Sequence, residues 1–172
     1  NKSDVFNFGG SKTDNNGVKI FTPDVHTDYR GDLWTIWKRD EFPKDLDFNH
    51  DKISTSRKNV IRGIHGDFKS WKLCTCLYGE IYVVIVDNRK DSKTYMQWES
   101  LILNDRKKQS VLLPPGVGNS FCVLSDYTIF MYKWAYSGEY YDVDKQFTIK
   151  WDDPKLNINW PIENPILSER DK

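Results

Sequence analysis

The sequence predicts an all-β domain, a sandwich or barrel of about ten short strands with short helical turns. Apolar and polar residues alternate from Val18 onward, in runs rich in Val, Ile, Tyr, Trp and Thr. No segment sustains a helical period, and we expect only a short helical turn near Arg39–Phe42. A chain of 172 residues suits one core rather than two. We therefore expect a flexible polar tail at 1–16 and a single domain over 17–172.

Turn-forming residues separate the expected strands. Gly79 between two apolar runs predicts a tight hairpin, and Asn104-Asp105 predicts another turn. Pro114-Pro115-Gly116 should end a strand abruptly. The expected strands are Val18–Thr22, Leu33–Trp37, Asn59–Ile64, Lys72–Tyr78, Ile81–Asp87, Glu99–Leu103, Ser110–Leu113, Phe121–Leu124, Thr128–Trp134 and Gln146–Trp151.

Charge and cysteine content narrow the classes of function. The 25 Lys and Arg balance the 25 Asp and Glu, so the overall basic excess that favours non-specific nucleic-acid or membrane-surface binding is absent. No apolar run approaches the length of a membrane span. Three cysteines argue against a disulfide framework, and Cys74 and Cys76 alternate as small buried residues would. We expect a cytoplasmic protein that binds neither nucleic acid nor membrane.

The stretch from Asn59 to His65, followed by Lys72, places an imidazole between two cations on expected strands. Arg62, His65 and Lys72 together suit an anionic substrate that loses a weakly acidic proton. Histidine titrates near neutral pH, and cations stabilise the negative charge that develops. Judged by residue type alone, the alternative interpretation is that His65 is a structural histidine beside surface charges.

Further motifs follow in order along the chain. They read RGIH at 62–65, GEIYVVIVDNRK at 79–90, PPGVGNSF at 114–121, MYK at 131–133, YY at 140–141, WDDPKLNINWP at 151–161 and SERD at 168–171. In this order they resemble the dTDP-4-dehydrorhamnose 3,5-epimerase family, over roughly Val18 to Asp171. One such motif would be weak evidence, whereas this many in one order are not expected by chance.

The resemblance implies a cupin-type jelly roll, or double-stranded β-helix, usually a homodimer. It implies a nucleotide-diphosphate-linked 4-keto-6-deoxy sugar as substrate, with no cofactor and no metal. Chemistry agrees with this, because a ketone at carbon 4 acidifies the protons on carbons 3 and 5. Inversion then needs a base on one face of the ring, an acid on the other, and cations or amides near the enolate oxygen.

By the family's pattern, four residues carry the chemistry. His65 is the base, and Asp171 orients its ring and stabilises the imidazolium. Tyr132 is the acid on the opposite face, and Lys72 lies near the enolate. Taken singly, Asp171 reads as a solvated charge near the chain end, Tyr132 as a core aromatic and Lys72 as a strand-edge charge; only their joint occurrence favours catalysis.

The pattern also implies the substrate-binding residues. Arg30 and Arg62 match positions that contact the substrate and its phosphates, as suits a bidentate guanidinium, and Tyr141 matches the position that stacks on the base. The expected set is Arg30, Arg62, Asn119, Tyr141, Arg170 and Lys52.

The chain departs from the family pattern at recognition positions. Asn119 stands where the family commonly has His, Thr35 where it has Glu, and 50–52 reads His-Asp-Lys for Gln-Asp-Asn. Gly66-Asp67 replaces an aromatic and Gln after the catalytic His, and an insertion lies around Ser137–Glu139. This suggests the same reaction on a different nucleotide sugar. The combination looks most like the epimerases that process GDP-linked 4-keto-6-deoxy-heptoses for bacterial capsules, although the nucleotide and the sugar stay open.

Three rival functions also stay open. His65-Gly66-Asp67 is half of a two-His-one-carboxylate iron site, but no His follows His65, so we expect no metal. A non-catalytic sugar-nucleotide-binding jelly roll would not need an acid and a base on opposite faces. A 3,4-ketoisomerase or a 3-epimerase is not separable from a 3,5-epimerase by sequence, because the outcome depends on how Tyr132 is aimed.

Overall fold

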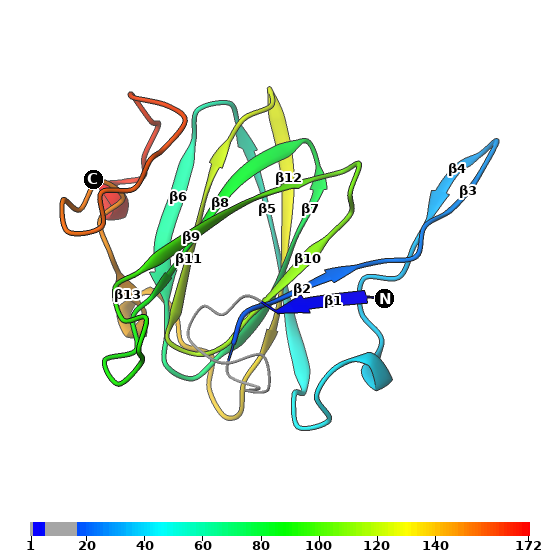
Figure 1. Cartoon of the computed structure of the whole chain (residues 1–172), viewed down its shortest axis with the longest axis horizontal. Coiled ribbons are helices and arrows are strands. Elements are labelled where there is room, and N and C mark those ends of the chain that lie inside the picture. The colour runs from blue at the N-terminus through cyan, green and yellow to red at the C-terminus, as the bar shows by residue number, and fades with distance from the viewer. Residues whose placement is uncertain (1, 6–16) are drawn as a thin grey trace.

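A computed structural model describes residues 2–5 and 17–172, which form two facing antiparallel sheets and a separate hairpin (Figure 1). The first sheet has the order β1-β2-β10-β7-β12-β5, with β1 at Lys2–Val5, β2 at Lys19–Thr22, β10 at Ser110–Leu113, β7 at Trp71–Tyr78, β12 at Tyr127–Ala135 and β5 at Phe48–Arg57. The second has the order β13-β6-β11-β8-β9, with β13 at Phe147–Thr148, β6 at Ile61–Gly66, β11 at Val117–Val123, β8 at Glu80–Asp87 and β9 at Trp98–Asn104. The hairpin joins β3 (His26–Asp28) and β4 (Gly31–Leu33).

The core lies between the two sheets. Cys74 and Phe130 of the first sheet and Ile85 and Phe121 of the second are at most 2 % exposed and belong to one apolar cluster. The predicted all-β jelly roll is therefore confirmed. So is the burial of Cys74 and Cys76, both of which are free thiols.

Helices are almost absent from the described part of the chain. They comprise three 3₁₀ turns, η1 at Arg39–Glu41, η2 at Val143–Lys145 and η3 at Glu169–Asp171. The first confirms the helical turn expected near Arg39–Phe42. None of them is long and apolar enough to span a bilayer.

Most expected strands are present with boundaries shifted by one or two residues, but some predictions were wrong. Leu33–Trp37 is not a strand; only Leu33 is extended, as the end of β4. The strand expected at Gln146–Trp151 shrinks to Phe147–Thr148, and that expected at Phe121–Leu124 begins earlier, at Val117. Strand β5 was missed because most of its side chains are exposed at a sheet edge and carry no apolar alternation.

Most of the predicted tail at 1–16 lies outside the described residues. Of this segment the structure describes β1, which pairs antiparallel with β2, its Val5 opposite Lys19.

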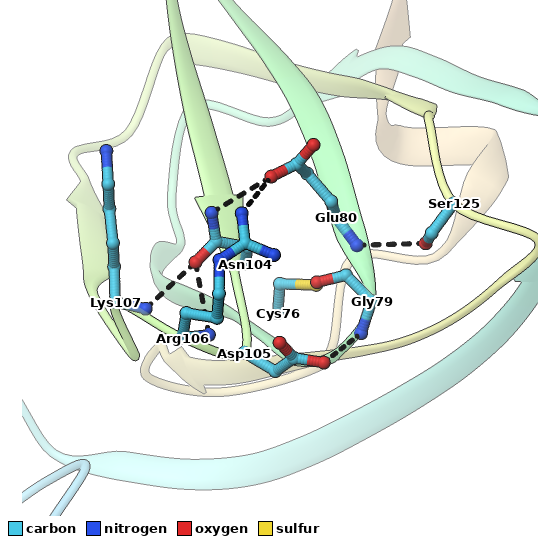
Figure 2. A network of polar contacts seen from close by, with 8 residues as sticks. All are labelled: Cys76, Gly79, Glu80, Asn104, Asp105, Arg106, Lys107 and Ser125. Carbon is cyan, nitrogen blue, oxygen red and sulfur yellow. Dashed lines mark hydrogen bonds and ion pairs between the residues drawn. The ribbon is translucent and has the colours of Figure 1, made fainter.

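Figure 2 shows the polar contacts between the turn at Gly79, which follows β7, and the turn at Asn104-Asp105, which follows β9. Gly79 joins β7 to β8 with a φ of 86°, and its amide donates to Asp105 over 2.8 Å. The Glu80 carboxylate accepts from Asn104 and Arg106 over 3.1 and 2.8 Å. The hairpin predicted at Gly79 and the turn predicted at Asn104-Asp105 are thus confirmed, and side-chain bonds tie them together.

Candidate active site

A cavity of about 520 Å³ is lined by β5, β6, β12 and the C-terminal segment. Both sheets contribute to it, so its walls belong to different parts of the chain. The lining residues are Lys52, Ile53, Ser54, Val60, Ile61, Arg62, His65, Tyr132, Ile166, Leu167, Ser168, Arg170 and Asp171. The cavity thus collects most of the predicted site residues.

His65 of β6 forms a dyad with Asp171 of η3. Nε2 of His65 lies 2.5 Å from Oδ1 of Asp171, whose other oxygen accepts from the Gly63 amide over 3.2 Å. Burial alone would raise the pKa of Asp171, but hydrogen bonds from His65, Gly63 and Ser168 hold that pKa below its usual value. An ionised carboxylate only accepts, so Nε2 carries the hydrogen and Nδ1 is left as the basic nitrogen.

Gly63 is required at its position for two reasons. Its φ is 108°, a region that L side chains rarely adopt, and an added Cβ would lie 2.5 Å from the Asn119 carbonyl oxygen. Its amide donates to Asp171 of η3. The glycine of the Arg-Gly-Ile-His motif therefore helps to anchor the dyad.

We expect Gly63→Ala to destabilise the fold by about 2–4 kcal/mol, from backbone strain together with the clash. Gly31→Ala is a matched control, because Gly31 has a φ of 129° but nothing within 4 Å of an added Cβ. Urea unfolding of both variants separates strain from clash. Equal losses of unfolding free energy in Gly63→Ala and Gly31→Ala would show that the clash with β11 contributes nothing to the destabilisation.

Tyr132 lies across the cavity from the dyad. It comes from β12 of the first sheet, whereas His65 comes from β6 of the second. Burial raises the pKa of Tyr132 well above its usual value, so the phenol is neutral at pH 7. The dyad and a neutral phenol therefore come from the two different sheets that line the cavity.

Lys72 lies deeper, next to these walls, and is 4 % exposed. Its Nζ donates to Oδ1 of Asn119 over 2.9 Å and lies 4.6 Å from the ring centroid of Trp134. Burial lowers the pKa of Lys72 to about 8. The ammonium is thus mostly charged at pH 7 and loses its charge as the pH rises through about 8.

Three further cations line the cavity and are held by neighbouring side chains. Arg62 donates through Nε to Ser56 over 2.8 Å, and Arg170 donates through Nε to Thr148 over 2.9 Å. Lys52 donates to the Tyr140 hydroxyl over 2.6 Å. Anchored cations around one cavity suit an anionic ligand such as a diphosphate.

Four predicted site residues are not part of the cavity lining: Lys72 and Asn119, which are buried and hydrogen-bonded to each other, and Arg30 and Tyr141. Arg30 is on the β3–β4 hairpin, where it pairs with Asp28 over 2.6 Å and keeps 76 % of its side chain exposed. The Nζ of Lys69 lies 4.0 Å from the centroid of the Tyr141 ring. Within one chain, neither Arg30 nor Tyr141 reaches the dyad's cavity.

The sequence did not indicate that a group of aromatic rings lies beside Lys52. The Tyr140 ring lies 4.7 Å from that of His50 and 5.4 Å from that of Trp134. Lys52 lies over Tyr140 at 4.8 Å. Alternate residues of a strand lie on the same face, so Trp134 on β12 and His50 and Lys52 on β5 could have been placed together if β5 had been predicted.

The iron-site alternative has little support in the side-chain geometry. Asp67 follows His65 but turns into a tight loop, where its Oδ1 accepts the amides of Lys69 and Ser70 over 2.8 and 2.6 Å. Across residues 2–5 and 17–172, no three His, Cys, Asp or Glu side chains gather as a metal site.

Comparison with known proteins decides the family. The family profile of dTDP-4-dehydrorhamnose 3,5-epimerase matches residues 12–172. The chain belongs to this family. It is accordingly an isomerase, a carbohydrate epimerase, as its fold and motifs predict.

Individual relatives agree over nearly the whole chain. The dTDP-4-dehydrorhamnose 3,5-epimerase of Shigella flexneri is 35% identical over 93% of this chain and 91% of its own length. The dTDP-4-dehydrorhamnose 3-epimerase of Streptomyces niveus is 34% identical over 91% of this chain and 77% of its own. The crystal structure of the dTDP-6-deoxy-D-glucose-3,5-epimerase from Legionella pneumophila, in complex with dTDP-4-keto-L-rhamnose, superimposes with a TM-score of 0.86 at 31% identity, covering 99% of this chain and 90% of that one.

Proposed function

We propose that this epimerase inverts carbon 3, carbon 5 or both of a nucleotide-linked 4-keto-6-deoxy sugar through an enolate. The observation that carries the proposal is the His65–Asp171 dyad on one wall and Tyr132 on the other wall of a single cavity. The ligand in the Legionella structure is a sugar nucleotide of this type. Acid and base on opposite sides of one ring are what inversion requires and what simple binding does not.

The proton balance closes with two protein groups and solvent water. Nδ1 of His65 removes the proton next to the ketone, the C–H electron pair enters the enolate, and Asp171 stabilises the imidazolium. Lys72 stabilises the enolate oxygen. Tyr132 then gives its hydroxyl proton to the opposite face of the carbon, and exchange with water returns His65 and Tyr132 to their starting forms.

Deuterium incorporation tests the proposal directly. The protein is incubated in deuterated water with a 4-keto-6-deoxy sugar nucleotide, and NMR follows deuterium and configuration at carbons 3 and 5. Deuterium together with inversion supports an epimerase. A ketone that moves to carbon 3 would indicate a 3,4-ketoisomerase, and bound sugar without any deuterium would indicate a binding protein.

We further propose that the nucleotide is GDP and the sugar a heptose destined for a bacterial capsule or lipopolysaccharide. The departures from the family pattern at His50 and Lys52 support this, because both residues contact Tyr140 beside the cavity. Such clustering favours a rebuilt nucleotide end, with His65, Tyr132 and Asp171 retained. Deuterium uptake is compared between GDP- and dTDP-linked substrates; a preference for dTDP of tenfold or more in kcat/KM, about 1.4 kcal/mol, would contradict the assignment.

We propose that the working unit is a homodimer in which the hairpin completes the partner's site. The hairpin projects from the body (Figure 1), and its Tyr29 and Leu33 are 97 % and 72 % exposed. Strand β5 offers an open sheet edge beside the cavity, with Ile53 64 % exposed. A partner hairpin along that edge would cover this apolar surface and bring Arg30 to the substrate phosphates.

Mixing two inactive variants tests this arrangement. We expect Arg30→Ala and His65→Asn each to be inactive as homodimers, whereas a mixed dimer regains one complete site with His65 from one chain and Arg30 from the other. Activity of up to about half of the unmodified dimer's is expected, one site in two. No recovery in dimers confirmed by light scattering would place Arg30 in its own chain's site or in none.

Chelation is expected to leave the rate unchanged, because every proton transfer above uses a side chain of the protein. The rate is measured after dialysis against a strong chelator, with elemental analysis of the same sample. A rate that falls on dialysis and returns with one added divalent metal would contradict this mechanism.

A further inference from the structure

Two neighbouring residues, Lys108 and Gln109, hold the base of the β3–β4 hairpin. Gln109 donates through Nε2 to the hydroxyl of Thr22 over 3.0 Å, where β2 ends and the chain leaves for the hairpin. The Lys108 ammonium lies 3.2 Å from Oδ2 of Asp32 on β4 and 4.6 Å from the ring centroid of Trp34, just past β4. Both ends of the hairpin are thus fastened to one short segment of the body.

Lys108 itself extends from a well-ordered turn. Its amide donates to the Asn104 carbonyl over 3.2 Å, and its ammonium donates to the Asp105 carbonyl. Oδ1 of Asn104 in turn accepts the amides of Arg106 and Lys107 over 3.1 and 2.8 Å (Figure 2). Only 11 % of the Lys108 side chain is exposed, so its contacts with the hairpin are shielded more than those of an ordinary surface ion pair.

The hairpin carries the effect of this anchor to its tip. Asp32 accepts from the Thr27 hydroxyl over 2.6 Å, which joins β4 to β3. Near the tip, Asp28 accepts the Arg30 amide over 2.8 Å and its Nη2 over 2.6 Å. A two-stranded hairpin alone is marginally stable at best, so its direction depends on its contacts with the body.

We propose that Lys108 is a positioning residue that fixes the direction of the β3–β4 hairpin and with it the place to which Arg30 is carried. This inference rests on the proposed function, in which Arg30 reaches the substrate phosphates in the partner's site. A guanidinium binds a phosphate only at hydrogen-bond distance, and a small rotation at the base of the hairpin moves the tip further than that. Lys108 therefore acts on the substrate through Arg30.

The first test measures nucleotide binding by calorimetry, with GDP and dTDP as the probes. Lys108→Met keeps most of the side chain and loses the ammonium, so we expect about tenfold weaker binding, as when a charge-assisted phosphate contact is misplaced. Lys108→Arg keeps the charge and should recover most of the affinity. Lys107→Met, at the exposed neighbouring lysine, is the matched control and should bind as the unmodified protein does.

A double variant separates positioning from a merely structural role. If Lys108 acts through Arg30, then Lys108→Met should weaken nucleotide binding no further in an Arg30→Ala protein, because both changes remove the same contact. An undiminished loss in that background would overturn the proposal. So would normal binding by folded Lys108→Met when Arg30→Ala alone binds weakly.

A second readout needs no nucleotide and keeps the inference separate from the proposed function. Spin labels are attached at Tyr29→Cys and Lys58→Cys, since both positions are exposed and the three native cysteines are buried. Ile53→Asp is added to remove the β5 surface on which a partner's hairpin would lie. Double electron–electron resonance should give one narrow distance distribution, broadened by Lys108→Met and narrow again with Lys108→Arg.

The two readouts together assign any failure. An unchanged distance distribution in Lys108→Met would overturn the proposal, because the hairpin would then keep its direction without the ammonium. A broadened distribution in a protein whose nucleotide binding is insensitive to Arg30→Ala would support the role of Lys108. That result would count against the homodimer arrangement alone.

Discussion

His65→Asn is expected to abolish deuterium incorporation at both carbon 3 and carbon 5, with a loss of at least about 100-fold. The asparagine amide reaches only to the position of Nδ1, so the buried Asp171 carboxylate, 3 % exposed, loses its donor at Nε2 and keeps the Gly63 amide. What disappears is the basic nitrogen that the dyad leaves facing the cavity. The rates of incorporation and inversion are measured by NMR against the unmodified protein.

Two controls show that the base alone has been removed. A thermal melt should still show a cooperative transition, at a somewhat lower temperature because Asp171 has lost a donor. Calorimetric binding of the product nucleotide diphosphate should persist, because Arg62 and Arg170 are held by side chains other than His65. A folded, nucleotide-binding His65→Asn protein with near-normal incorporation would exclude His65 as the base. Incorporation lost at only one carbon would indicate a second base.

Much of the fold was predictable because buried strands carry their own signal. Strand β10 was predicted residue for residue, since Ser110–Leu113 is bounded by proline and buried throughout. Strand β5 was invisible for the opposite reason: an edge strand with exposed side chains reads as a polar loop. Its place in the fold depends on pairing with β12, in which Lys52 lies opposite Tyr132.

The candidate site, like the fold, was predictable only in part. Motif order identified His65, Tyr132 and Asp171, and the structure brings them to one cavity although 106 positions separate His65 from Asp171. No local pattern could have indicated that Arg30 would lie on a projecting hairpin, because the contacts of a hairpin depend on tertiary and quaternary packing. Nor could sequence indicate that Asn119 accepts a hydrogen bond from Lys72, since the two residues come from strands of different sheets.

Tyr132→Phe is expected to retain deuterium incorporation and to lose inversion, by at least about 100-fold. His65 can remove a proton and return a deuteron to the same face, which labels the carbon without changing its configuration. Inversion needs a donor on the other face, and a phenol suits this because it is neutral at pH 7 and its proton can pass to an adjacent carbanion. Tyr132 packs edge-on against Phe130 at 4.6 Å, so phenylalanine should fill the same space at little cost in stability.

The ratio of inversion to incorporation, measured at each carbon, separates a catalytic phenol from a core aromatic. A core residue would leave the ratio unchanged while the melting temperature falls slightly. If the ratio falls at carbon 3 and carbon 5 alike, one phenol serves both and the ring must turn between steps. If Tyr132→Phe still inverts both carbons at close to the parent rate, the donor is another group on that wall. The Lys72 ammonium, charged below about pH 8, is then the nearest alternative, and its involvement would appear as inversion that declines as the pH rises through that value.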